Sequence, residues 1–149
     1  MEVPPLDATM NPAQVVLIRR SFEFFKPCGP ALVAHATRGL IDSHSVLGSL
    51  MPANPAGLHR RCFETLEQIV RRCDRFGALE APLGELGRRA GRHGLSHLHY
   101  GTMKRHLLQA MADLAGPDWG PELQEAWELL LDAAIGAMSA GSFPGSKAA

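Results

Sequence analysis

Apolar side chains recur every three or four positions along nearly the whole chain, between segments rich in proline and glycine. The central stretch shows the pattern most clearly, with Leu58, Cys62, Leu66, Ile69 and Cys73 in steps of three and four. This spacing places apolar residues on one face of an α-helix. Because no segment alternates between apolar and polar residues for long enough to form a strand, the sequence predicts an all-α protein.

Proline and glycine divide the chain into separate helical segments. The Asn11-Pro12 and Asn54-Pro55 pairs are typical helix starts, with asparagine as the cap and proline in the first turn. The expected helical segments are residues 12–26, 30–41, 45–50, 55–75, 82–90, 97–114 and 121–140. We expect a leader at residues 1–10, one domain at 11–140 and a tail at 141–149.

Composition excludes several classes of function. The formal net charge of the 149 residues is zero, which argues against binding to nucleic acid or to an anionic membrane surface. No apolar run is long enough for a membrane span, and the acidic, proline-rich start is unlike a signal peptide. Three widely spaced cysteines favour a reduced, cytoplasmic setting. No nucleophile with a placed base and no phosphate-binding loop is present, so we expect no enzyme activity.

Three stretches of sequence carry a family resemblance: GPALVAHATRGLI (29–41), GLHRRCFETLEQIV (57–70), and HYGTMKRHLL (99–108) with the later WGPELQEAW (119–127). Together they make residues 12–140 similar to bacterial single-domain globins and to the globin part of flavohaemoglobins. The resemblance implies a three-over-three sandwich of seven or eight helices, with a haem pocket between the fifth and sixth. Flavohaemoglobins continue into a reductase that this sequence does not contain, so we expect no electron supply from within the chain.

The resemblance also implies that the haem pocket has changed. Ala90 occupies the place of the histidine that ligates the iron in the family. Met51 stands for the pocket phenylalanine, Thr37 for the distal tyrosine, and Leu58 for the distal glutamine or histidine, while Cys62 lies one turn further along. The predicted pocket residues are Thr37, Met51, Leu58, Cys62, Leu66, Leu86 and Ala90.

Losing the axial imidazole removes the strong bond between a globin and its haem iron. We therefore favour a globin-fold binding or sensor-type protein with a degenerate haem pocket, holding no cofactor or a small apolar ligand. The alternative is a globin that binds haem b for gas binding, sensing or detoxification, with His93 as a non-standard ligand after a shift of one turn. Cys62 and Met51 also carry sulfur donors, but both are ordinary core residues. A protein partner or a homodimer fits either hypothesis.

Charge is unevenly distributed along the chain. Ten Lys or Arg and five acidic residues lie between Arg60 and Arg105, whereas the segment from His106 onward has six acidic residues and one basic residue. Arg88, Arg89 and Arg92 flank the pocket mouth that the resemblance implies. They are either solvated or form an anion site for haem propionates or another carboxylate. His97 and His99, at the start of a predicted helix, are interpreted as capping or exposed residues.

Overall fold

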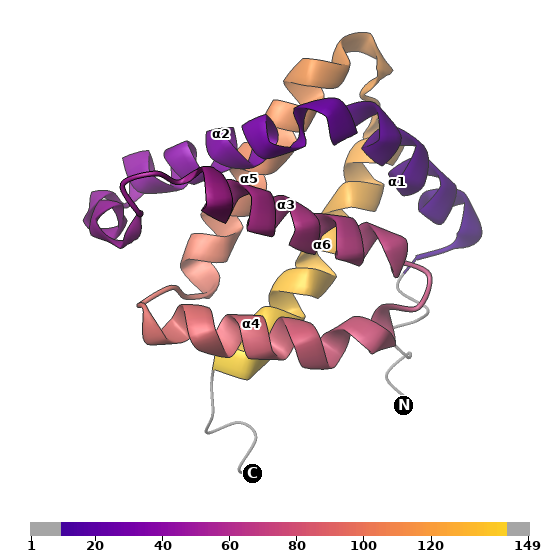
Figure 1. Ribbon diagram of the computed structural model, residues 1–149. Helices are drawn as coiled ribbons and strands as arrows, with labels where there is room; N and C mark the ends of the chain where they lie inside the picture. Colours follow the sequence, from indigo (N-terminus) through magenta and orange to yellow (C-terminus); the bar gives the residue numbers. More distant parts are fainter. Residues whose placement is uncertain (1–9, 143–149) are drawn as a thin grey trace.

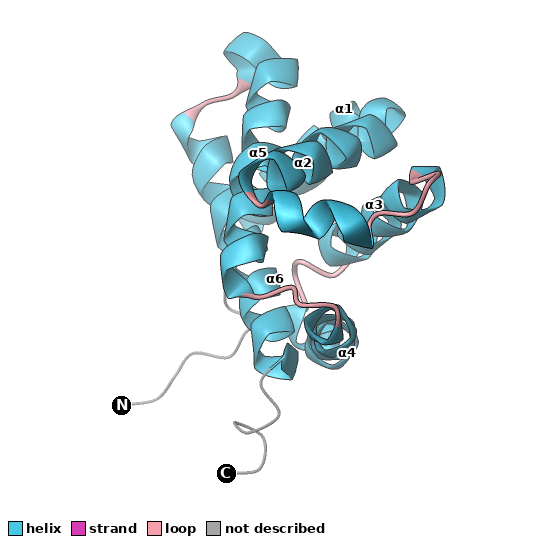
Figure 2. Cartoon of the chain, turned by 90° about the vertical axis from the view of Figure 1, so that its left-hand side faces the viewer, coloured by secondary structure: helices cyan, strands magenta, loops and turns pink. Residues whose placement is uncertain are grey.

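The computed structural model describes residues 10–142, so most of the expected leader and tail lie outside the described residues. Six α-helices account for most of this range, and no strand occurs within it (Figure 2). They are α1 (Pro12–Phe25), α2 (Gly29–Ser43), α3 (Ala56–Arg71), α4 (Glu80–Arg92), α5 (His97–Ala115) and α6 (Pro121–Ser142). The all-α prediction is confirmed. Within residues 10–142, no helix has both the length and the apolar character needed to cross a membrane.

Short 3₁₀ segments connect several of the helices. They are η2 (Lys26–Cys28), η3 (Ser45–Leu50), η4 (Phe76–Leu79) and η5 (Gly116–Asp118). The helical turn expected at residues 45–50 is therefore a 3₁₀ helix. The other six segments predicted from the sequence correspond to the six α-helices. A 3₁₀ helix is wound more tightly than an α-helix and rarely extends beyond a few residues, so it commonly occurs in short connections.

Local capping explains where α1 begins and ends. The Asn11 side chain accepts a hydrogen bond from the Gln14 backbone N–H (2.8 Å), and the Gln14 side chain accepts one from the Asn11 N–H (3.0 Å). This reciprocal pair is a capping box, with Pro12 directly inside it. The predicted start is thus confirmed, and the helix ends at Phe25, one residue before the expected Lys26.

The predicted bounds of the central helix were wrong at both ends. Residue 55 is the N-cap of α3, and Asn54 accepts a hydrogen bond from the Ala56 N–H (3.2 Å). At the other end α3 stops at Arg71 rather than at residue 75. Beyond Arg72 the backbone N–H groups bond carbonyls three residues earlier in the chain instead of four; the Cys73 N–H, for example, bonds the Val70 carbonyl (3.3 Å). The turn that follows buries Cys73 and Phe76 in the core.

The helices pack in two crossed layers. In Figure 1, α3 and α4 run across the picture in front of α5 and α6, and Figure 2 shows the same crossing from the side. The most extensive contacts join α4 to α6 and α2 to α5, followed by α2 to α3. This arrangement makes α3 and α4 neighbouring walls on one side of the molecule.

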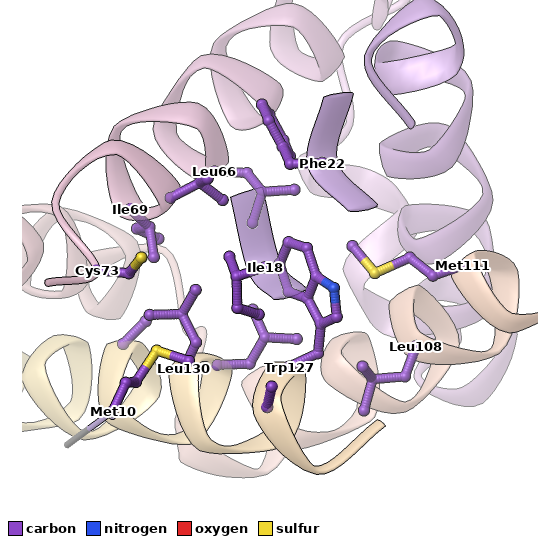
Figure 3. Close-up of a cluster of buried hydrophobic side chains, with 14 of the residues drawn as sticks. Met10, Ile18, Phe22, Leu66, Ile69, Cys73, Leu108, Met111, Trp127 and Leu130 are labelled. Carbon is purple, nitrogen blue, oxygen red and sulfur yellow. The ribbon is translucent and has the colours of Figure 1, made fainter. Parts of the chain in front are cut away.

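Trp127 on α6 lies at the centre of the hydrophobic core (Figure 3). Its side chain is fully buried, and its indole N–H donates a hydrogen bond to Ser21 Oγ (2.9 Å). Ile18 and Leu130 pack in the same cluster. Met10, which falls in the expected leader, is also buried in this core with 7% of its surface exposed.

One glycine on each helix brings α4 against the backbone of α6. A methyl group built on Gly87 would overlap the backbone of Met138, and one built on Gly141 would overlap the backbone of Gly84. Only residues without a side chain allow two helices to approach so closely. The position of α4, and of everything it carries, is therefore set by this contact.

We expect Gly87→Ala to lower the free energy of unfolding by about 1–3 kcal/mol, because the added methyl group forces α4 away from α6. The measurement is urea denaturation followed by circular dichroism. Gly136→Ala is the matched control, since Gly136 is a helical glycine of α6 with open space around it. Alanine there should be neutral or stabilising, because it reduces the entropy of the unfolded chain. Equal effects of the two substitutions would contradict the close contact.

Candidate functional site: a cleft between α3 and α4

A cleft of about 450 Å³ opens between the end of α3 and α4. This volume falls within the range of small-molecule sites in proteins. Its lining comes from α3, from η4 and from α4: Thr65, Gln68, Ile69, Arg72, Ala78, Leu79, Pro82, Leu83, Leu86 and Arg89. On each of the two helices the lining residues recur at helical spacing, so they lie on a single face of that helix.

The floor of the cleft is apolar. Ile69, Leu79 and Leu83 are buried, and they belong to the same hydrophobic cluster as the core of the molecule. Leu86 packs against this cluster while remaining partly accessible. An apolar group that enters the cleft would therefore meet the side of the core, where removal from water is favourable.

The polar residues of the lining have different hydrogen-bond and ion-pair partners. The Thr65 hydroxyl donates to the Arg61 carbonyl (3.1 Å) within its own helix. The guanidinium of Arg72 donates to the side-chain oxygen of Gln68. Arg89 lies 4.0 Å from a Glu85 carboxylate oxygen, at the limit of an ion pair. The cleft thus has two arginines in its lining and no acidic residue.

Of the seven predicted pocket residues, the cleft lining includes Leu86 alone. Leu66 is buried in the core. Thr37 is also buried, and its hydroxyl donates to the Val33 carbonyl (2.7 Å). The remaining four are half-buried outside this lining: Met51, Leu58, Cys62 and Ala90. A common pocket for these residues remains a prediction.

The end of α4 carries the two residues proposed for the axial position. The Ala90 carbonyl accepts hydrogen bonds from the N–H groups of His93 (3.0 Å) and Leu95 (3.1 Å). These bonds close the helix end. His93 is the C-cap residue of α4, and its side chain is exposed.

The three arginines predicted at the pocket mouth have different surroundings. Arg89 lines the cleft, whereas Arg88 forms an ion pair with Glu85, and Arg92 is exposed. The second arginine of the cleft is Arg72, which was not predicted from the sequence. The sequence feature that could have identified Arg72 is its position seven residues after Thr65, on the same face of the helix.

The residues lining the cleft do not fit haem. Haem iron in proteins is held by histidine, cysteine, methionine or tyrosine, and none of these is in the lining. Cys62 lies outside it, and burial raises the pKa of its thiol, opposed in part by the charge of Arg61. That thiol is therefore protonated at neutral pH, whereas the thiolate is the form that binds metal.

Two histidines meet near the start of α5, away from the cleft. His99 Nδ1 accepts a hydrogen bond from the Ser96 backbone N–H (3.0 Å) and so caps the helix, while the His97 side chain is exposed. Both interpretations from sequence are confirmed. The ring of His44 lies edge-on to that of His99, with 4.8 Å between the ring centres, and its Nε2 lies 3.3 Å from Thr102 Oγ1.

This cap makes stability depend on pH. Burial, and then the neighbouring His44, lower the pKa of His99 from its ordinary value of 6.5. The folded chain therefore takes up this proton at a lower pH than the unfolded chain, and stability falls as the pH drops below about 6.5. Protonation also turns Nδ1 into a donor, which removes the acceptor for the Ser96 N–H.

We expect His99→Gln to flatten the fall in melting temperature between pH 7.5 and pH 5.5, because glutamine keeps the capping acceptor without titrating. Thermal unfolding followed by circular dichroism measures the effect. His97→Gln is the control and should keep the wild-type pH dependence. A steep fall that persists in the His99→Gln variant would show that another group is responsible.

Comparisons with known proteins agree with this architecture. The globin family matches residues 53–138, more than half of the chain. No curated protein matches it in sequence. An engineered carbene transferase from Rhodothermus marinus, named as a nitric oxide dioxygenase, superimposes with a TM-score of 0.78 at 22% identity, covering 93% of this chain and 97% of its own.

The closed form of the globin domain of HGbRL covers 89% of this chain and 96% of its own. It is 20% identical, with a TM-score of 0.42. The family match to residues 53–138 spans the two helices that form the cleft and extends into α6. This chain belongs to the globin family.

Proposed function

We propose that this globin is a non-haem binding module of the sensor type, which takes a small apolar ligand in the cleft between α3 and α4. The observation that carries the proposal is the composition of the cleft. It combines a buried apolar floor of Ile69, Leu79 and Leu83 with a lining that offers no ligand for iron. Such a site favours an organic molecule held by burial rather than by a metal bond.

The surroundings of the family's haem site support the same proposal. Ala90 has a methyl group where an iron-ligating imidazole is expected from the family resemblance, and its carbonyl is used in closing α4. Thr37, at the expected distal position, uses its hydroxyl within α2. Neither residue therefore offers the group by which a globin holds iron or iron-bound gas.

A haem-binding globin is the alternative function. Globins usually bind haem, and the Rhodothermus marinus neighbour is named as a nitric oxide dioxygenase. In this chain the alternative requires an axial ligand such as His93, whose exposed side chain lies at the C-cap of α4. Ligation by His93 would also require a shift of one turn from the position of the family's ligand, so we favour the non-haem function.

We expect 1-octanol, a small apolar probe, to raise the melting temperature of the wild-type protein in a saturable way, because a ligand that binds only the folded state stabilises it. Ala78→Phe should reduce this rise by filling the cleft that Ala78 lines. Differential scanning calorimetry at increasing octanol concentration measures both effects.

Ala81→Phe is the matched control. Ala81 is an exposed residue of the same region but lies outside the cleft lining. Its variant should respond to octanol as the wild type does. An unchanged response in Ala78→Phe, or no response in the wild type, would contradict ligand binding in the cleft.

A further inference from the structure

We infer that the ligand of this cleft is a monoanionic amphiphile, with one short alkyl chain and a carboxylate head that pairs with Arg72. This inference rests on the proposed function and adds the chemical class of the ligand. The lining contains two cationic side chains, Arg72 and Arg89, and no acidic one. A neutral apolar ligand would leave both of these charges unused.

Among the described residues, Arg72 lacks a carboxylate partner, unlike Arg19 and Arg71; Arg75 lacks one too but lies outside the cleft lining. Arg19 pairs with Asp74 (3.0 Å), and Arg71 lies 3.7 Å from Glu67. Within residues 10–142, no carboxylate oxygen lies within ion-pair distance of Arg72, whose guanidinium bonds the neutral amide of Gln68 instead. Half-buried at the end of α3, Arg72 is thus a cation without a counter-charge.

A carboxylate is the ligand group that best satisfies this arginine. The guanidinium presents a planar fork of N–H donors that matches the two oxygens of a carboxylate, and such charge-assisted bonds are about twice as strong as neutral ones. The Gln68 amide accepts one of these donors at present, and the other donors of the fork are available to a ligand.

The second cation limits the charge of the ligand. Arg89 lies on the opposite wall, and its side chain is 62% exposed. Its carboxylate partner, Glu85, is 4.0 Å away and also pairs with Arg88. Because the Arg89 side chain is largely exposed, water screens most of its charge, and the half-buried Arg72 is the cation that a ligand's charge chiefly meets. This difference favours one negative charge over two.

The size and shape of the cleft indicate a single short alkyl chain. Its volume of about 450 Å³ lies toward the small end of ligand sites. With the carboxylate at Arg72, the alkyl chain lies along the apolar floor formed by Ile69, Leu79 and Leu83. Octanoate therefore serves as the probe, and 1-octanol is its uncharged counterpart of the same chain length.

Isothermal titration calorimetry with octanoate and 1-octanol tests the inference. For the wild type we expect octanoate to bind about tenfold more tightly than octanol, because it gains the charge-assisted bond to Arg72. Arg72→Gln should weaken octanoate binding about tenfold and leave octanol binding within twofold. Arg89→Gln, on the opposite wall, should weaken octanoate binding by a smaller factor.

Arg75→Gln is the matched control, because Arg75 is exposed and lies outside the cleft lining. It should leave both affinities unchanged. Equal affinity of the wild type for the two probes, or an equal loss in Arg75→Gln, would overturn the inference while the proposed function stands. If neither probe binds, the proposed function fails together with the inference. Circular dichroism of each variant confirms that it folds.

Discussion

The close contact between α4 and α6 is the constraint on which the rest of this structure depends. Gly87 on α4 and Gly141 on α6 let the two helix backbones approach to a distance that a methyl group would prevent. This contact fixes α4, and α4 provides one wall of the cleft as well as Ala90 and His93 at its end. The opposite wall, α3, is held by its own buried stripe of Leu66, Ile69 and Val70. The cleft is therefore supported on both sides by the core.

The family resemblance implies a haem pocket between these two helices, and in this chain the cleft between them has no histidine, cysteine, methionine or tyrosine in its lining. The buried floor of the cleft gives non-directional affinity for an apolar group. Arg72 adds a directional contact at its edge, since its charge has no carboxylate partner among the described residues. Together they are the basis for the proposal that the site selects a ligand by its alkyl chain and its charge.

The helices were predictable from the sequence because the capping residues and apolar spacing that define them are local features. Asn11 with Gln14 caps α1, and the apolar spacing identifies the buried face of each helix. The cleft was less predictable, because it depends on which residues two separate helices bring together. Arg72 gave no local sign that it would lack a partner, and α3 ends at Arg71, before a turn that buries Phe76 in the core. The hydroxyl of Thr37 likewise bonds its own helix, a contact that family resemblance does not reveal.

The most direct test of a globin without haem is the absorption spectrum of the protein produced with haem supplied and then passed through gel filtration. We expect the wild type to emerge without a Soret band and the Ala90→His variant to retain one, because an imidazole there restores the family's ligand at the end of α4. Arg92→His, an exposed position of the same helix, is the control and should remain colourless. A stable Soret band in the wild type that His93→Ala abolishes would contradict the non-haem function.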